Sequence, residues 1–187
     1  MAQTQIRIGG FGGQGVILSG IIIGRAAAIH GGLHATLIQS FGPEARGSSS
    51  SAELIVADEP ILYPYVKELD MLVVLSQDAY ARFTPALRKG GLLVTEADLV
   101  KLTPPAPEAR HYVVPATRLA EEIGRKIVLN IITVGFFGAV SGIIPLGALE
   151  QAVKESVPAG TLDLNLRAFR KGYEAGLAAL AEAKATV

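Results

Sequence analysis

A glycine-rich turn near the start of the chain has a residue pattern that could bind an anion. Gly10, Gly12 and Gly15 have the G-x-G-x-x-G spacing of the first strand-to-helix turn in dinucleotide-binding domains. At such a turn the backbone can approach a phosphate closely, and the following helix presents unpaired N–H groups and a partial positive charge. The pattern therefore predicts an anion site. The alternative is that the glycines only let the helix pack closely against the strand.

The loop at residues 40–47 is expected beside this turn. It follows the apolar run 35–39, which is typical of a strand, and open α/β sheets bind ligands beyond the carboxyl ends of their strands. Arg46 in this loop could contact a carboxylate or a phosphate through two parallel hydrogen bonds. It could equally pair with Glu44 as a solvated loop charge, which is the more ordinary role. The loop is therefore a second candidate contributor to the anion site.

The end of the same predicted strand argues against NAD. In an NAD-binding domain an acidic residue about 20 positions beyond the glycines binds the ribose hydroxyls. This chain has Gln39 and Ser40 at that point. A free-standing protein that binds NAD or FAD through the glycine turn is therefore kept only as an alternative.

The glycine turn lies within a regular alternation of strands and helices. We predict a strand from residue 6 into the glycines, further strands at 35–39, 52–57, 70–76, 92–95 and 111–114, and helices at 14–30, 77–88, 116–124 and 162–182. The serines 48–51 are assigned to a loop because small polar residues cluster there. The alternation predicts an α/β fold with a mostly parallel sheet and a Rossmann-like first βαβ unit, in a single domain of residues 1–187.

Residues 127–149 contain no charged residue over 23 positions, which is long enough to raise the question of a membrane span. Asn130, Pro145 and several glycines interrupt this stretch, and a strand–helix alternation precedes it. We therefore expect no membrane span, but a buried helix that neighbouring elements approach closely at its glycines. A further helix is expected to start at Pro145.

The first and last helices are expected to pack differently. The helix at 14–30 is apolar around most of its circumference, which predicts burial on more than one side. The helix at 162–182 should dock by a single face, because its large apolar residues recur in steps of three and four. These residues are Leu162, Leu166, Phe169, Tyr173, Leu177 and Leu180.

Composition excludes several classes of function. The chain has 17 basic and 17 acidic residues, so nothing in its charge favours nucleic acid or an anionic membrane. It has no cysteine, which excludes disulfides, thiolate zinc sites, iron–sulfur clusters held by this chain and a cysteine nucleophile. The start of the chain has no signal-peptide pattern, so we expect a cytoplasmic protein. Only 18% of residues are charged, against about 25% in typical soluble domains, which favours a chain that works among partners.

Several segments together resemble a known family. They are Gly10-Phe11-Gly12-Gly13-Gln14-Gly15-Val16, Phe41-Gly42-Pro43-Glu44-Ala45-Arg46-Gly47, Asp58-Glu59-Pro60-Ile61, and, near the end, Asn165 with Ala168-Phe169-Arg170-Lys171-Gly172-Tyr173. The chain resembles the gamma subunit of 2-oxoacid:ferredoxin oxidoreductases, the group that includes pyruvate, 2-oxoglutarate, 2-ketoisovalerate and indolepyruvate enzymes. The resemblance covers nearly the whole chain. Ser48 departs from it, because the family has a second glycine after Gly47.

The resemblance implies a three-layer α/β domain in a larger enzyme, which oxidatively decarboxylates a 2-oxo acid onto coenzyme A and reduces ferredoxin. Thiamine diphosphate with its magnesium would be held by alpha and beta subunits. Iron–sulfur clusters would be held by other chains, including a ferredoxin-like delta subunit. The gamma subunit would contribute assembly and coenzyme A contacts, with no catalytic or metal-ligating residue of its own.

The residues expected to contact coenzyme A come from the glycine turn and the 40–47 loop. They are Gly10, Phe11, Gly12, Gly13, Gln14, Gly15, Ser40, Gly42, Pro43, Glu44 and Arg46. A third interpretation is a pure assembly subunit whose glycine turn binds nothing. It differs from the first only in whether coenzyme A touches this chain.

We predict that the chain expressed alone has no oxidoreductase activity and no visible chromophore, because it has no cysteine and no thiamine-site motif. The measurement is an assay of the purified chain with a 2-oxo acid, coenzyme A and an electron acceptor, together with its visible absorption spectrum. Turnover by the isolated chain would contradict the prediction.

Overall fold

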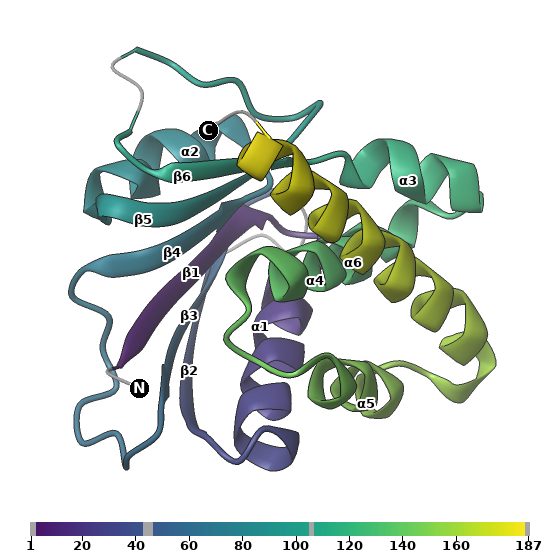
Figure 1. Cartoon of the computed structure of the whole chain (residues 1–187), viewed down its shortest axis with the longest axis horizontal. Helices are drawn as coiled ribbons and strands as arrows, with labels where there is room; N and C mark the ends of the chain where they lie inside the picture. The colour runs from purple at the N-terminus through teal and green to yellow at the C-terminus, as the bar shows by residue number, and fades with distance from the viewer. Residues whose placement is uncertain (1–2, 43–46, 105–106, 186–187) are drawn as a thin grey trace.

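The computed structural model describes residues 3–42, 47–104 and 107–185. Within these residues the chain forms six strands and six α-helices, with four short π or 3₁₀ turns (Figure 1). In order they are β1 (Thr4–Phe11), α1 (Val16–Arg25), η1 (Ala26–His30), β2 (His34–Phe41), β3 (Ser49–Ala57), β4 (Leu69–Val74), α2 (Gln77–Phe83), η2 (Thr84–Ala86), β5 (Leu87–Glu96), β6 (Arg110–Val114), α3 (Ala116–Ile123), η3 (Lys126–Val128), α4 (Leu129–Ser141), α5 (Leu146–Ser156), η4 (Ala159–Thr161) and α6 (Leu162–Ala185).

The strands form one sheet in the order β2-β3-β1-β4-β5-β6. β1, β4, β5 and β6 are paired in parallel, whereas β3 runs antiparallel to both of its neighbours, β1 and β2. Five of the six strands therefore run in one direction. This confirms the predicted α/β fold with a mostly parallel sheet.

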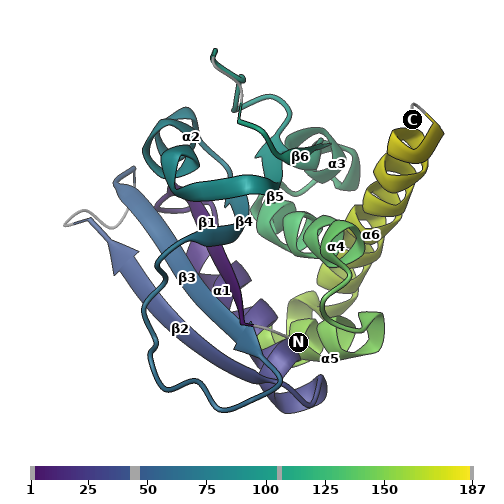
Figure 2. The ribbon, with the colours of Figure 1, turned by 60° about the vertical axis from the view of Figure 1, so that its left-hand side comes forward.

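Helices cover both faces of the sheet, as Figures 1 and 2 show. The face under α2 has a small core in which Tyr80 and Phe83 pack against Leu72 and Leu93. The other face is covered by α1 and α4, and α5 and α6 pack against these helices. This side contains the main core, with Ile6, Ile8, Leu54 and Val73 from the strands among its members. The three-layer arrangement is thus α2, sheet, and a thick helical layer.

β3 splits the first βαβ unit. β1 and β2 point the same way, but β3 lies between them and pairs with both. The prediction that serines 48–51 form a loop is wrong for Ser49, Ser50 and Ser51, which belong to β3. Ser50 pairs with Gly10 on one side and Phe41 on the other. Ladder hydrogen bonds to two neighbouring strands therefore override the weak strand preference of these residues.

α1 is surrounded by other elements, as its all-round apolar surface predicts. Ile22 and Ile23 are buried, and the helix packs on β3 on one side and α4 and α5 on another. Its approach to the sheet is close, since a Cβ on Gly20 would lie 2.6 Å from the Cβ of Ala52. The helical segment continues through η1 and ends at His30. Gly31 is its C-cap, and Gly32 follows with a left-handed φ of 67°, which suits glycine.

α4 forms the central part of the uncharged stretch at residues 127–149. Every residue from 130 to 140 is buried, so the helix lies in the middle of the helical layer. Pro145 is the N-cap of α5, as expected. None of the described helices is long and apolar enough to cross a bilayer. The absence of charge on α4 is therefore explained by burial within the protein.

α4 and α6 cross with their backbones in contact. A Cβ added at Gly135 would overlap the carbonyl oxygen of Phe169, and one at Gly172 would overlap the carbonyl oxygen of Ile132. The expectation of close approach at the glycines of residues 127–149 is therefore met. The predicted docking stripe of α6 is only partly right, because Leu177 is 48% exposed. The buried face of α6 is centred on its small residues, since only small residues let two helices approach this closely.

We predict that Gly172→Ala lowers the free energy of unfolding by about 1–3 kcal/mol, because the new methyl group would overlap a backbone carbonyl that cannot rotate away. The matched control is Gly24→Ala, also inside a helix, where a Cβ meets only the side chain of Leu54 at 3.4 Å. This control should be neutral or stabilising by up to about 1 kcal/mol. Urea denaturation of the purified variants measures both. Equal stabilities would contradict the close contact.

Candidate functional site

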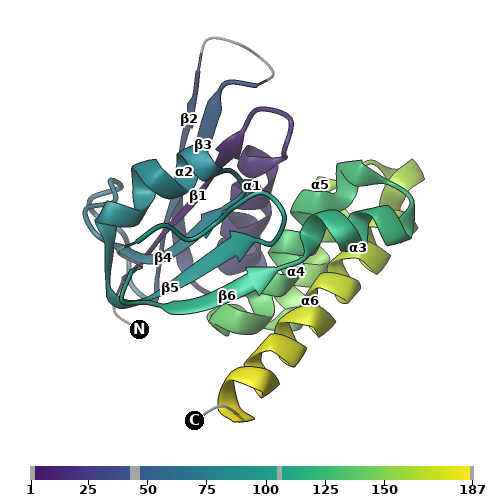
Figure 3. The same cartoon turned by 90° about the horizontal axis from the view of Figure 1, so that it is seen from above.

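A cavity of about 510 Å³ opens where β1 and β2 end. Because both strands run in the same direction, the carboxyl ends of β1 and β2 lie at one edge of the sheet (Figure 3). The predicted site residues that line the cavity are Phe11, Gly12, Gly13, Gly15 and Gly42. The structure therefore brings the two predicted segments together.

Backbone hydrogen bonds hold the two segments against each other. The N–H of Gly12 donates to the carbonyl of Ser48 at 2.8 Å, and the N–H of Gly47 donates back to the carbonyl of Gly12 at 3.3 Å. Gly42 N–H donates to the carbonyl of Ser49 at 3.0 Å, which closes the base of the loop. The walls of the cavity are thus set by main-chain contacts.

Gln14 fastens the glycine turn to the sheet. Its Oε1 accepts the N–H of Phe11 at 2.6 Å, and its Nε2 donates to the carbonyl of Leu75, just past β4, at 2.8 Å. A Cβ on Gly10 would lie 2.6 Å from this same Oε1, so a larger residue beneath the turn would displace the Gln14 amide. Both ends of the Gln14 amide are engaged within the protein, so its side chain positions the turn.

The start of α1 offers backbone donors that an anion could use. The N–H groups of Gly12 and Gln14 are already used within the turn. The first helical hydrogen bond comes from Ser19 to the carbonyl of Gly15, at 2.9 Å, so the preceding N–H groups of the first turn have no helical acceptor. The residues that carry these groups, Val16, Ile17 and Leu18, line the cavity. Of the glycine turn itself, the N–H groups of Gly12 and Gln14 are therefore not open to an anion, and anion binding at the start of α1 stays a prediction.

Gly15 is the N-cap of α1 and has a left-handed conformation with a φ of 73°. A Cβ at this position would lie 2.5 Å from Cγ of Asn130, the second residue of α4. Glycine is therefore required at position 15 for two reasons. The backbone is left-handed there, and Asn130 occupies the space that a side chain would need. The site is braced by α4 as well as by the sheet.

Three comparisons place the chain among known proteins. The family model described as pyruvate ferredoxin/flavodoxin oxidoreductase matches residues 5–175. The chain belongs to this family. The 2-oxoglutarate synthase subunit KorC of Methanocaldococcus jannaschii is 45% identical over 174 residues, which cover 92% of this chain and 93% of that protein.

Solved structures agree with this assignment. The gamma subunit of a keto/oxoacid ferredoxin oxidoreductase from Geobacter sulfurreducens matches with a TM-score of 0.86 and 36% identity, over 96% of this chain and 99% of that one. A 2-oxoglutarate:ferredoxin oxidoreductase from Magnetococcus marinus, solved with 2-oxoglutarate, coenzyme A and succinyl-CoA bound, matches with a TM-score of 0.83. At 23% identity, over 94% of this chain and 31% of that one, it shows the fold alone. The resemblance to a gamma subunit is confirmed.

Two predicted residues within the described part of this gamma-type chain, Gly10 and Ser40, do not line the cavity. Gly10 is buried within β1, and Ser40 is exposed near the end of β2. Pro43, Glu44 and Arg46 lie outside the described residues, so their predicted contacts stay predictions.

Sequence reasoning missed several residues that line the cavity. They are Val16, Ile17, Leu18, Phe41, Ser48 and Ser50. Phe41 stands in a family-like segment and could have been included. Phe11 and Phe41 are 37% and 68% exposed, which leaves two aromatic side chains with free surface at the cavity.

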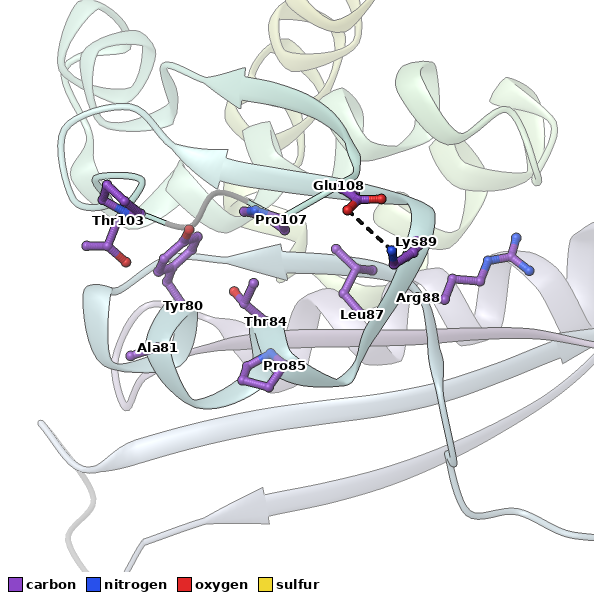
Figure 4. Close-up of a pocket in the computed structure, with 11 residues that line it drawn as sticks. Tyr80, Ala81, Thr84, Pro85, Leu87, Arg88, Lys89, Thr103, Pro107 and Glu108 are labelled. Carbon is purple, nitrogen blue, oxygen red and sulfur yellow. Dashed lines mark hydrogen bonds and ion pairs between the residues drawn. The ribbon is translucent and has the colours of Figure 1, made fainter.

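A second cavity, of about 470 Å³, lies on the face covered by α2 (Figure 4). Tyr80, Thr84 and Pro107 face it, and Lys89 at its side pairs with Glu108 at 3.3 Å. None of the residues singled out in the sequence lies here. The charged groups of its lining are already paired, Lys89 with Glu108 and Arg88 with Asp70, so the glycine-turn cavity is the better candidate.

Glu96, at the end of β5, is fully buried and would be a candidate acid or base by its burial alone. Its Oε2 accepts the N–H groups of Asp98 and Leu99 at 2.7 and 2.9 Å, and its Oε1 accepts that of Thr117 at 2.8 Å. These bonds tie the end of β5 to the start of α3. The carboxylate is therefore a structural anchor.

We predict that Gln14→Glu lowers the free energy of unfolding by about 1–3 kcal/mol, because a carboxylate oxygen would replace the donor that now bonds the Leu75 carbonyl. Gln39→Glu is the matched control, since Gln39 is exposed on β2, and its effect should be close to zero. Urea denaturation of both variants tests this. Equal effects would show that Gln14 does not fasten the turn.

Proposed function

We propose that this chain is the gamma subunit of a multi-subunit, cytoplasmic 2-oxoacid:ferredoxin oxidoreductase. The complex would oxidatively decarboxylate a 2-oxo acid to an acyl-CoA, with thiamine diphosphate in partner chains, and pass the electrons to ferredoxin. The relative with 45% identity is a 2-oxoglutarate synthase subunit, which favours 2-oxoglutarate as the substrate. Membership of the family over residues 5–175 is the observation that carries the proposal.

The partners follow from what this chain lacks. With no cysteine it has no thiolate ligand for an iron–sulfur cluster, so a ferredoxin-like delta subunit would hold the clusters. Alpha and beta subunits would hold thiamine diphosphate and its magnesium. This chain would bind and position, and its 18% charged residues suit a surface covered by other subunits.

The contribution of this chain to the reaction would be a coenzyme A contact at the glycine-turn cavity. The start of α1 offers free backbone N–H groups and the positive end of the helix dipole, and no acidic side chain stands in its first turn. A phosphate group of coenzyme A fits these donors, and Arg46 would add a charge-assisted hydrogen bond. Phe11 and Phe41 would provide apolar surface beside it.

A carboxylate from a neighbouring subunit could use the same donors, which is the assembly alternative. The two alternatives predict different effects when the site is weakened. Loss of a coenzyme A contact affects only the dependence on coenzyme A, whereas loss of a subunit contact affects the complex itself.

We predict that Arg46→Ala in the reconstituted complex raises the KM for coenzyme A by about ten- to a hundredfold. This is the effect expected from the loss of one charge-assisted hydrogen bond, which contributes about 1.5–3 kcal/mol. The dependence on the 2-oxo acid and the assembly of the complex should be nearly unchanged. Arg110→Ala, at the start of β6 and so at the opposite end of the sheet, is the matched control and should leave the KM unchanged. An unchanged KM with a dissociating complex would assign the site to assembly.

A further inference from the structure

β2 forms one edge of the sheet, and β6 forms the other. Figure 2 shows β2 at the outer margin of the sheet, and among the described strands it pairs only with β3. A strand at a sheet edge carries backbone N–H and C=O groups that have no partner within the sheet. The outer side of β2 therefore presents a row of donors and acceptors.

The hydrogen-bond pattern shows which residues of β2 carry these groups. The N–H of Gly42 donates to the carbonyl of Ser49 at 3.0 Å, and this pair continues the β2–β3 register. Hydrogen-bonded pairs alternate with non-bonded pairs along an antiparallel ladder, so the even-numbered residues of β2 bond β3. Ala35, Leu37 and Gln39 therefore direct their N–H and C=O groups toward the free edge.

β2 lacks the features that usually keep an edge strand from pairing. Such edges typically carry a lysine, a proline or a bulge, or are very short. Residues 35–41 contain no Asp, Glu, Lys, Arg or Pro, and the β2–β3 register runs from His34 to Phe41 without a shift. The other edge strand, β6, has only five residues and begins with Arg110. Of the two edges, β2 is thus the one suited to accept a further strand.

β2 of a second copy of this chain matches the edge. In an antiparallel pair centred on Leu37, Ala35 of each copy lies opposite Gln39 of the other, which pairs the outward N–H and C=O groups of all three residues. The same register places Thr36 opposite Ile38, and β-branched residues pack well across neighbouring strands. Because residues 35–41 are uncharged, the pair brings no like charges together. A different chain would find no charge on this edge to select it.

We propose that β2 is a self-association edge, through which two copies of this chain pair antiparallel and join their six-stranded sheets into one. Leu37 packs into the main core on the side of α1, and residues opposite each other in an antiparallel pair share a face. The helical layers of the two copies therefore lie on the same side of the joined sheet. The proposal does not depend on the coenzyme A contact, because none of residues 35–39 lines the glycine-turn cavity.

Sedimentation velocity of the purified full chain over a dilution series tests the pairing. The unmodified chain should form a dimer of two 19.5 kDa copies. Gln39→Pro removes an outward N–H and leaves the bonds to β3 in place, and each dimer loses this donor twice, so the Kd should rise about ten- to a hundredfold. Gln39→Ala keeps the N–H and is the matched control, with an unchanged Kd. Urea denaturation checks that both variants are folded.

Amide hydrogen exchange of the unmodified chain gives a second readout that needs no substitution. It is measured at a low and at a high protein concentration. The amides of Ala35, Leu37 and Gln39 should exchange more slowly at the high concentration, because they become hydrogen-bonded in the dimer. The amides of β6 should exchange equally at both. If Gln39→Pro does not fold, this measurement decides alone.

Three outcomes would overturn the proposal. The first is a chain that stays monomeric at every concentration, and the second is a dimer whose Kd is the same in Gln39→Pro. The third is slower exchange confined to β6, which would place self-association at the other edge. Protection of the β2 amides that arises only when partner subunits are added would assign the edge to a strand of another chain, and the second copy would be the wrong occupant.

Discussion

The backbone contact between α4 and α6 is the constraint on which the rest of the structure depends. Gly135 and Gly172 leave no space for a side chain, so the two helices approach until one backbone touches the other. This lets α4 lie wholly inside the helical layer, with α6 over it and α1 beside it. A larger residue at either glycine would push α4 out of position, and the start of α4 is what supports the glycine turn.

The candidate site therefore depends on contacts from three directions. Gln14 fastens the turn to the end of β4, Ser48 closes it from the β3 side, and Asn130 fills the space that Gly15 leaves open. Such a turn can present the start of α1 to an anion without reorganising, which is how a preformed site reduces the cost of binding. Of the two uses weighed at the outset, the structure shows close packing at Gly10 and Gly15, and anion binding stays a prediction. Packing alone accounts for Gly10.

The antiparallel strand β3 gives the site its second wall. Because β3 inserts between β1 and β2, the loop that joins β2 to β3 is a hairpin, and its ends are held directly over the glycine turn. In an unbroken βαβ unit β2 would lie beside β1, and no strand would separate the loop from the turn. The hairpin also makes β2 an edge strand of the sheet, and the glycine-turn cavity lies at the end of that edge.

Local pattern determined much of this protein from its sequence. It predicted the strand–turn–helix with its glycines, the mostly parallel α/β class, a buried helix within residues 127–149, and the family. These follow from short-range periodicity and from motifs whose residues are close in the chain. The position of β3, the strand conformation of Ser49 to Ser51 and the small-residue docking face of α6 were decided by tertiary structure. The contact between Gly15 and Asn130 was also decided by tertiary structure. Each of these depends on pairing or packing between residues distant in sequence, where a neighbour's backbone outweighs local preference.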